Sequence, residues 1–209
     1  MINSGEGVPG HTGTLLELPI VRLQVQTDRI KPGRAPWRTY RPEVLREVDR
    51  LIATDDGVIG VDADGTEHVD VHNRTHPHTR DPKGLAGISV MSTGDYAALR
   101  DRYGAHLVDG VAGESILVEH VPGLARRDMP VTMMLRCADG EEWPLTGVHI
   151  AEPCVEFTRF CLRLSASNEV GDDVRQGLLD LGGGARGYKM VTGRSGIRIR
   201  RGDTLLVHV

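Results

Sequence analysis

The C-terminal stretch GYKMVTGRSGIRIRRGDTLLVHV (187–209) indicates a fold built from short strands. Its aliphatic and β-branched residues alternate with polar residues, which is typical of strands that have one buried face. Glycines interrupt this alternation, so we expect two or three separate strands. Arg201-Gly202-Asp203 predicts a hairpin turn between the last two strands, because glycine adopts the backbone conformations of tight turns without strain.

The same strand pattern recurs upstream, in four further stretches: 12–26, 57–71, 113–121 and 130–152. Two of these stretches contain an aspartate–glycine pair, Asp64-Gly65 and Asp139-Gly140, and such a pair between strand patterns is a strong hairpin signal. We therefore expect 57–71 and 130–152 to form antiparallel hairpins.

Helical patterns are fewer and shorter than strand patterns. Residues 42–51 begin with a proline and repeat their apolar residues at helical spacing, which predicts a short helix. A second helix is expected after a strand at 88–91, with Ser92 or Thr93 as its cap and Gly104 at its end. Two further helical segments follow Pro153, at 155–164 and 174–181.

The composition favours one folded domain over residues 1–209. The chain is 39% hydrophobic and 26% charged, as in ordinary globular proteins, and its length suits one sizeable core. Aromatic residues make up only 4%, whereas 26 glycines and 11 prolines favour strands and turns over a helical bundle. We expect a mainly β fold with short helices (α+β). A closed or partly closed mixed β-barrel would leave the fewest exposed strand edges.

Several classes of protein are disfavoured. The chain has no apolar run of about 18 residues, and the N-terminal MINSGEGVPGHTG lacks the features of a secretory signal, so we expect neither a membrane span nor secretion. Three cysteines are too few for a disulfide framework, which favours a cytoplasmic protein with reduced thiols. The net charge of −4 disfavours nucleic-acid binding.

Positive charge is nevertheless concentrated in two runs that contain no acidic residue. Their basic residues are Arg29, Lys31, Arg34, Arg38 and Arg41 in the first run, and Arg186, Lys189, Arg194, Arg198, Arg200 and Arg201 in the second. Local basic clusters on an acidic protein predict an anion site, such as a site for a phosphate group. The alternative is a solvated strand face.

Residues 152–161, EPCVEFTRFC, place Cys154 directly after Pro153, at the expected start of a helix. Unpaired N–H groups and the helix dipole at such a position favour a thiolate over a thiol. The alternative is packing, because free cysteine is often buried as a small apolar residue. Cys154 is thus a candidate reactive cysteine, and His149 on the preceding strand is a candidate proton partner.

A polar loop is expected at 72–84, after the first predicted hairpin. It places His72, His76 and His78 close in sequence to Asp70 and Asp81. Imidazole and carboxylate groups are ligands for divalent metals, so a metal site is one interpretation. The wall of a pocket and a plain polar loop are the others.

Five stretches of the chain follow one another in a characteristic order: DVHNRTHPHTRD, DYAALRDRYG, VAGESILVE, EPCVEFTRF and GARGYKMVTGRSGIRIRRGDTLLV. This order resembles the MOSC domain, a family named after the C-terminal domain of molybdenum cofactor sulfurases. The resemblance covers about residues 65–209, and strands within 12–64 would complete the same barrel. Its most specific element is Cys154 after a proline, and Gly113-Glu114-Ser115 resembles the family's Gly-Glu-Asn segment.

The resemblance implies a β-barrel in which Cys154 ligates the metal of a molybdenum–pterin cofactor or carries sulfur. Further cofactor contacts would come from Glu114, Ser115, His72, His76, Arg186 and Lys189. The last two lie beside Gly182–Gly184, a stretch that would otherwise be a simple helix end. Some relatives reduce N-oxygenated compounds, so the partners would be a small molecule and a redox or sulfur-donor protein.

The chain departs from many relatives in three respects. His149-Ile150-Ala151-Glu152 stands where they have an arginine shortly before the cysteine, and HNRTHPHTRD stands where they have His-Gly-Gly. The chain also has no room for the pyridoxal-phosphate desulfurase half of the large eukaryotic sulfurases, so we do not expect it to extract sulfur from free cysteine. The alternative function is a non-catalytic binding or scaffold barrel with a buried, inert Cys154.

Overall fold

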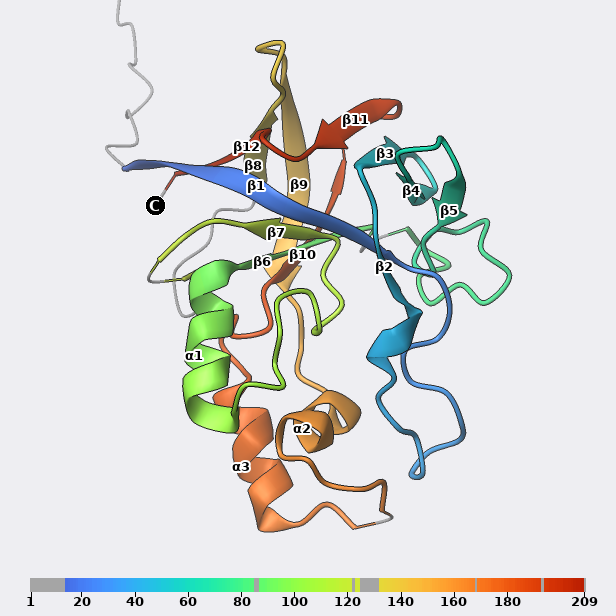
Figure 1. Cartoon of the computed structure of the whole chain (residues 1–209), viewed down its shortest axis with the longest axis vertical. Coiled ribbons are helices and arrows are strands. Elements are labelled where there is room, and N and C mark those ends of the chain that lie inside the picture. Colours follow the sequence, from blue (N-terminus) through green and yellow to red (C-terminus); the bar gives the residue numbers. More distant parts are fainter. Residues whose placement is uncertain are drawn as a thin grey trace, which may run out of the picture.

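Strands dominate the computed structural model, which describes residues 14–84, 87–121, 123–124, 132–167, 169–192 and 194–208 (Figure 1). The strands are β1 (Leu15–Gln26), β2 (Leu45–Glu47), β3 (Arg50–Thr54), β4 (Gly57–Val61), β5 (Glu67–Val69), β6 (Ile88–Ser92), β7 (Ile116–Val118), β8 (Thr132–Arg136), β9 (Glu142–Ile150), β10 (Tyr188–Thr192), β11 (Ile197–Arg200) and β12 (Thr204–His208). The α-helices of the described residues are α1 (Thr93–Tyr103), α2 (Val155–Cys161) and α3 (Asp172–Asp180), and a 3-10 turn covers Pro42–Val44.

Seven of these strands form a closed barrel, in the order β1-β12-β8-β9-β10-β6-β7 and back to β1. Their pairing is antiparallel except between β6 and β7, which run parallel and are joined through α1. The prediction of a mainly β fold with a closed mixed barrel is therefore confirmed. Closure satisfies the backbone hydrogen bonds on both sides of each of these strands.

The longest strand, β1, closes the barrel, and its C-terminal end reaches the candidate site. It pairs with β12 through its first half and with β7 and β2 through its second half. Leu18 and Ile20 are buried and alternate with exposed residues, as expected for a strand with one face in the core. Beyond Leu23 both faces are buried, because the second half also lies against β3, β4 and β5.

A smaller sheet with the order β11-β3-β4-β5 packs beside the barrel. The β4–β5 and β8–β9 pairs confirm the two hairpins predicted from their aspartate–glycine turns. Strands within residues 12–64 were expected to complete the barrel. β1 does so, whereas β3 and β4 belong to this smaller sheet.

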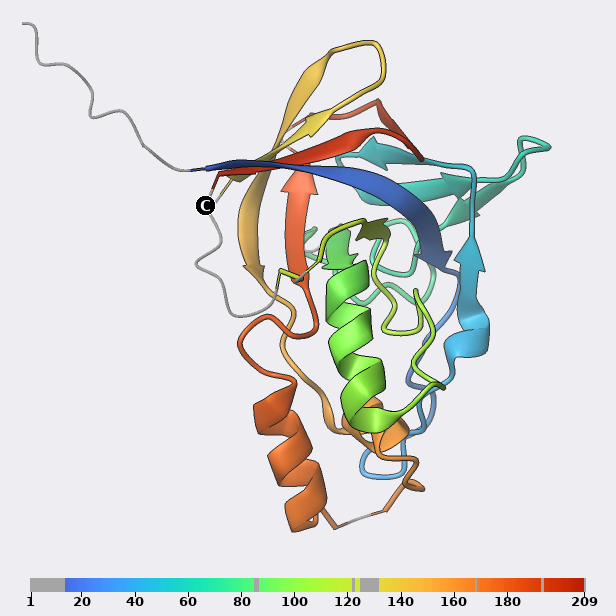
Figure 2. The same cartoon turned by 60° about the vertical axis from the view of Figure 1, so that its left-hand side comes forward.

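The three helices lie together beyond one end of the barrel, opposite the β8–β9 turn, as both ribbon views show (Figures 1 and 2). α1 begins at Ser92, whose side chain accepts a hydrogen bond from the N–H of Asp95, and ends at Gly104, as predicted. The helices enclose a second apolar cluster, separate from the barrel core: Met91, Tyr96, Leu99, Leu107, Val111, Ala112, Leu117, Phe157, Cys161 and Leu181. The space between this cluster and the barrel is where the candidate site lies.

Two local predictions are wrong. Residues 42–51 are not a helix, because Leu45–Glu47 pair with Gln24–Gln26 of β1 and sheet hydrogen bonds replace those of a helix. Arg201-Gly202-Asp203 is a turn but not a hairpin, since β11 pairs with β3 while β12 pairs with β1 and β8. Parts of the predicted strands, at 12–13, 130–131 and 209, lie outside the described residues.

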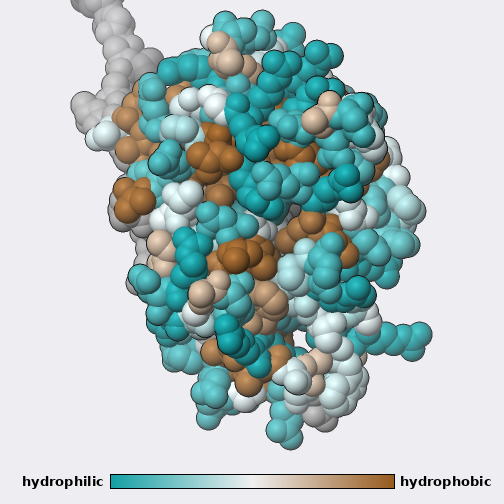
Figure 3. Space-filling model, viewed as in Figure 1, coloured by the Kyte–Doolittle hydropathy of each residue, from teal (hydrophilic) through white to brown (hydrophobic). Residues whose placement is uncertain are grey.

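The outer surface is mixed in polarity. On the face drawn in Figure 3, apolar areas are separated from one another by hydrophilic residues. None of the helices in the described part of the chain combines the length and the apolar character needed to cross a membrane.

The backbone between Arg186 and β10 allows a specific test of the fold. Gly187 has a φ of 76°, and a Cβ placed there would lie 2.0 Å from the carbonyl oxygen of Val90. Gly196 has a similar φ of 86°, but a Cβ there would contact nothing within 4 Å. Both positions disfavour a side chain, and only Gly187 adds a steric clash.

We expect Gly187→Ala to lower the free energy of unfolding by roughly 3 to 5 kcal/mol, and the matched Gly196→Ala by roughly 1 to 2 kcal/mol. Urea unfolding of both variants measures the difference. Equal losses would show that Gly187 is not packed against β6 as described.

Candidate functional site

A cavity of about 360 Å³ lies at the end of the barrel that faces the helices. Segments distant in sequence form its wall: the end of β1 and the loop after it, the loop after β5, the segment before β7, the segment before α2, and the chain leading into β10. Its lining residues are Gln26, Arg29, Ile30, Lys31, Tyr40, His72, Arg80, Asp81, Ser89, Ala112, Gly113, Glu114, Ala151, Glu152, Cys154, Arg186 and Lys189. This volume is in the range of sites for small organic ligands.

Cys154 lies at the predicted place, as the N-cap residue of α2, with an extended backbone (φ −133°, ψ 151°). Its side chain is half-buried, packs against the helical cluster and lines the cavity. The alternative of an inert cysteine assumes that the thiol is sealed in the apolar core. The thiol is not sealed there, because it lines the cavity. Because α2 has only seven residues, its dipole is a weaker source of positive potential than we expected.

Arg186 supplies the positive charge beside the sulfur. Its Nη1 donates to Sγ of Cys154 at 3.6 Å, and its Nη2 donates to the carbonyl oxygen of Ala112 at 2.7 Å. The guanidinium carbon lies 4.0 Å from the centre of the Phe157 ring, a cation–π contact. Nε of Arg186 is buried without a hydrogen-bond partner among the described residues, so one donor of this group is left for a ligand or a water molecule.

Glu114 is a second charged residue in the cavity wall, and it is only 4% exposed. Its Oε2 accepts a hydrogen bond from the Tyr96 hydroxyl at 2.7 Å, and that hydroxyl accepts one from the N–H of Ala112 at 2.9 Å. Oε1 is buried and has no hydrogen-bond partner in the described part of the chain. Burial raises the pKa of Glu114 to about 7, although the Tyr96 hydrogen bond and the charge of Arg186 favour the carboxylate.

The remaining cations of the cavity come from three separate segments. Arg29 and Lys31 follow β1, Arg80 is in the loop after β5, and Lys189 is on β10. Burial lowers the pKa of Lys189, and the charges of Arg186 and Lys31 lower it further. Two residues of each basic run identified in the sequence, Arg29 and Lys31 with Arg186 and Lys189, thus meet in one cavity, which favours an anionic ligand.

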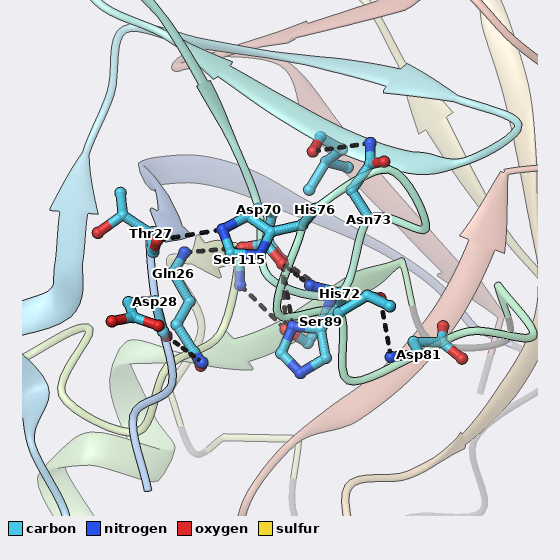
Figure 4. Close-up of polar contacts among 12 residues, drawn as sticks. Gln26, Thr27, Asp28, Asp70, His72, Asn73, His76, Asp81, Ser89 and Ser115 are labelled. Atoms are coloured by element: carbon cyan, nitrogen blue, oxygen red, sulfur yellow. Dashed lines mark hydrogen bonds and ion pairs between the residues drawn. The ribbon is translucent and has the colours of Figure 1, made fainter. Parts of the chain in front are cut away.

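The loop after β5 contributes His72 to the same cavity. Its Nδ1 lies 3.0 Å from Oδ1 of the buried Asp70, as Figure 4 shows. Ser89 also lines the cavity, and Ser115 supports it from behind through hydrogen bonds between the two serines. Ser115, predicted as a cofactor contact, therefore does not line the cavity itself.

The other histidines that we considered lie elsewhere. His76 Nε2 contacts the carbonyl oxygen of Thr27 at 3.2 Å, and His78 Nδ1 lies 2.9 Å from Oδ1 of Asp28. Neither residue lines the cavity, and the described residues contain no group of three or more His, Cys, Asp or Glu side chains arranged to hold a metal ion. The metal site proposed for the histidine loop is therefore not formed, because each ring has a different partner.

His149, the predicted proton partner of Cys154, is exposed and is also absent from the cavity wall. Its Nδ1 lies 2.8 Å from the carbonyl oxygen of Gly147, two residues earlier on the same strand. A histidine on the strand before the cysteine was a reasonable candidate, but the strand ends and a loop of several residues follows before Cys154.

The other two cysteines are placed as structural residues. Burial raises the pKa of Cys161 to about 12 and that of Cys137 to about 11. A high thiol pKa leaves little thiolate at neutral pH, so both are poor nucleophiles.

Sequence reasoning identified part of the cavity wall. Cys154, Arg186, Lys189, Glu114 and His72 were singled out, and all five line the cavity. Tyr40, Ser89 and Arg80 were missed, because they lie in unremarkable loop and strand sequences. Only the closure of the barrel brings them close to the cysteine.

Comparison with known proteins supports the fold. No family model and no curated protein matches the chain. Among the solved structures with a similar fold is the YuaD protein from Bacillus subtilis, which is 13% identical at a TM-score of 0.55, with 94% of this chain and 98% of that chain covered. Another is a hypothetical protein that is 10% identical at a TM-score of 0.53, with coverage of 92% and 69%. Similarity at this level of identity shows the fold alone.

Glu114 should make stability depend on pH. Its pKa is about 7 in the folded protein and near 4.5 when exposed, so the folded state binds this proton more tightly. Its contribution to the free energy of unfolding is therefore fully present below about pH 4.5 and is lost as pH rises to about 7, by roughly 3 kcal/mol. Glu114→Gln lacks this titration.

The stability of Glu114→Gln relative to wild type should accordingly increase by roughly 3 kcal/mol between about pH 4.5 and pH 8. Urea unfolding of both proteins over this range measures it. A difference that does not change with pH would contradict the buried position of the carboxyl group.

Removing the Arg186 charge should make Cys154 less reactive. The guanidinium contacts the sulfur at 3.6 Å and attracts negative charge there, so we expect Arg186→Gln to slow alkylation of Cys154 at pH 7 by roughly tenfold or more. Mass spectrometry of the peptide that contains Cys154 follows the reaction. Arg194→Gln is the matched control, because Arg194 also lies over an aromatic ring, that of Trp143, but does not line the cavity. Equal rates in the two variants would rule out the electrostatic role.

Proposed function

We propose that this protein binds a molybdenum–pterin cofactor or carries sulfur through Cys154. The observation that carries the proposal is a half-buried thiol, contacted by a guanidinium, in the wall of a cavity rich in cations. The order of sequence motifs that resembles the MOSC domain supports it independently. We also propose a cytoplasmic location, where a reactive thiol stays reduced.

The residues of the cavity fit such a cofactor. Thiolate sulfur is a soft ligand that suits molybdenum already bound by sulfur, and Cys154 is the thiol available in the cavity. A phosphate group needs guanidinium or ammonium donors, and Arg29, Lys31, Arg80 and Lys189 surround the same space. The unpartnered Nε of Arg186 adds a buried donor.

The roles of the residues follow from their contacts. Cys154 would be the metal ligand or the sulfur carrier, and Arg186 would orient its sulfur and place a positive charge beside it. Glu114 and Tyr96 hold the segment around Ala112, whose carbonyl oxygen accepts a hydrogen bond from Arg186. When bound, the cofactor supplies a metal centre that changes oxidation state, which is the chemistry required for reduction of N-oxygenated compounds.

A sulfur-carrier role needs one covalent step. The Cys154 thiolate attacks the outer sulfur of a persulfide on a donor protein, the sulfur–sulfur bond of the donor breaks, and the donor leaves as a thiolate. Cys154 then carries the transferred sulfur as a persulfide. One thiolate is consumed and one is released, so charge and oxidation state balance. The positive charge of Arg186 would stabilise the carried persulfide anion.

Molybdenum binding tests the proposal directly. Expressed in a host that makes the cofactor, the wild-type protein should retain molybdenum, and Cys154→Ser should retain less than about a tenth as much, because a neutral hydroxyl is a poor ligand for this metal. Serine is a favourable N-cap residue, so the variant should fold. Metal analysis of the purified proteins measures the difference.

Cys137→Ser is the matched control, because Cys137 is also half-buried but is outside the cavity. It should bind as much molybdenum as the wild type. Equal metal in Cys154→Ser and wild type, or none in either, would favour the alternative of a non-catalytic binding barrel.

A further inference from the structure

A buried carboxylate orients one histidine of the cavity. Asp70 is 3% exposed, and its two oxygens accept three hydrogen bonds. The N–H of Gln26 donates to Oδ2 at 2.7 Å, and the N–H of His72 donates to Oδ1 at 2.8 Å. Nδ1 of His72 lies 3.0 Å from the same Oδ1 (Figure 4). Two backbone donors thus fix the carboxylate, and the carboxylate fixes the ring.

This arrangement determines which ring nitrogen is available. A carboxylate that accepts backbone hydrogen bonds also accepts from Nδ1, so the proton of the neutral ring resides on Nδ1. Nε2 has no hydrogen-bond partner among the described residues, and the side chain of His72 is 28% exposed at the cavity wall. Nε2 can therefore accept a proton, or donate one when the ring is charged.

The charges around His72 define what the ligand would be. The charged and titratable groups that line the cavity with it are Arg29, Lys31, Arg80, Arg186 and Lys189, together with Tyr40, Asp81, Glu114, Glu152 and Cys154. Positive groups outnumber the acidic ones, and burial keeps part of the Glu114 population neutral near pH 7. The potential in the cavity thus favours an oxyanion, such as a phosphate group or the oxygen of an oxidised substrate.

We propose that His72, held by Asp70, exchanges a proton with an oxyanion bound in this cavity. In the forward direction the proton leaves Nε2 for a ligand oxygen, and the ring returns to its neutral form with Nδ1–H on Asp70. The ligand gains one proton and no electrons move. This assignment rests on the proposed function for the class of ligand, and it gives the acid–base role to His72 in place of His149.

Sulfate is a suitable probe, because it keeps its charge between about pH 6 and pH 8 and so takes up no proton itself. Calorimetric titration of the full-length protein with sulfate, in two buffers that differ in ionisation enthalpy, measures the protons taken up on binding. The wild-type protein should take up a fraction of a proton for each sulfate bound near pH 7, because a bound oxyanion favours the charged ring of His72. His72→Gln should lose most of this uptake.

Two further variants separate His72 from other groups. His149→Gln is the matched control and should behave as wild type, since His149 is exposed and outside the cavity. The comparison is repeated in a Glu114→Gln background, because Glu114 also titrates near neutral pH. The difference between His72→Gln and its parent should persist there. Unchanged uptake in His72→Gln, or a wild type that binds no sulfate, would overturn the proposal.

Asp70→Asn tests the positioning role. Nitrogen NMR of the ring should show the Nδ1–H form of His72 in wild type and a mixture of the two neutral forms in Asp70→Asn, with the His72→Gln spectrum providing the assignment. The same mixture of the two neutral forms in wild type and in Asp70→Asn would contradict the orientation of His72 by Asp70. These readouts involve no molybdenum, so a failed molybdenum test with retained proton uptake would leave an oxyanion site with an acid–base histidine.

Discussion

The contact between Arg186 and its surroundings connects the fold to the chemistry of the cavity. One guanidinium lies on the Phe157 ring, donates to the carbonyl oxygen of Ala112 and contacts the sulfur of Cys154. These three partners belong to α2, to the segment before β7 and to the turn before α2, so a single charged group orders three parts of the chain. Because a buried charge is costly without such partners, the helical end of the molecule must close around it in one arrangement.

The polar lining of the cavity comes from several segments that meet at one end of the barrel, and not from a single sequence motif. β1, β6 and β10 all contribute residues to the cavity at this end, and so does the loop after β5. Polar side chains from distant parts of the sequence can therefore gather at this end without disturbing the apolar core of the barrel. Acidic residues elsewhere on the chain offset the cations, which allows a protein with a net charge of −4 to hold a positive cavity.

The sequence predicted those features that depend on residues close to one another along the chain, such as helix ends and tight turns. Ser92 and Gly104 bound α1 as expected, because cap residues act within one turn, and both aspartate–glycine turns form hairpins. Residues 42–51 failed because a distant strand, β1, offers backbone partners that outweigh the helical pattern. For the same reason the sequence pointed to Cys154 but not to Tyr40, whose hydroxyl donates to Val111 only once the fold has formed. His149 was considered because it precedes Cys154 on a strand, and His72 because it lies in a polar loop, but only the folded structure distinguishes the exposed ring of His149 from the ring held by Asp70.

The pairing of β1 with β12 has a consequence for how the chain folds. Leu15 lies opposite His208, so the first and last strands of the described chain are neighbours in the barrel. During synthesis β1 must wait until β12 has left the ribosome, and until then the edge of β1 that pairs with β12 is unprotected. Contacts at such sequence separation slow folding, since a long loop must close before they form. Removal of β12 would thus leave both β1 and β8 with an unpaired edge, and the molecule would tend to associate with other copies through these edges.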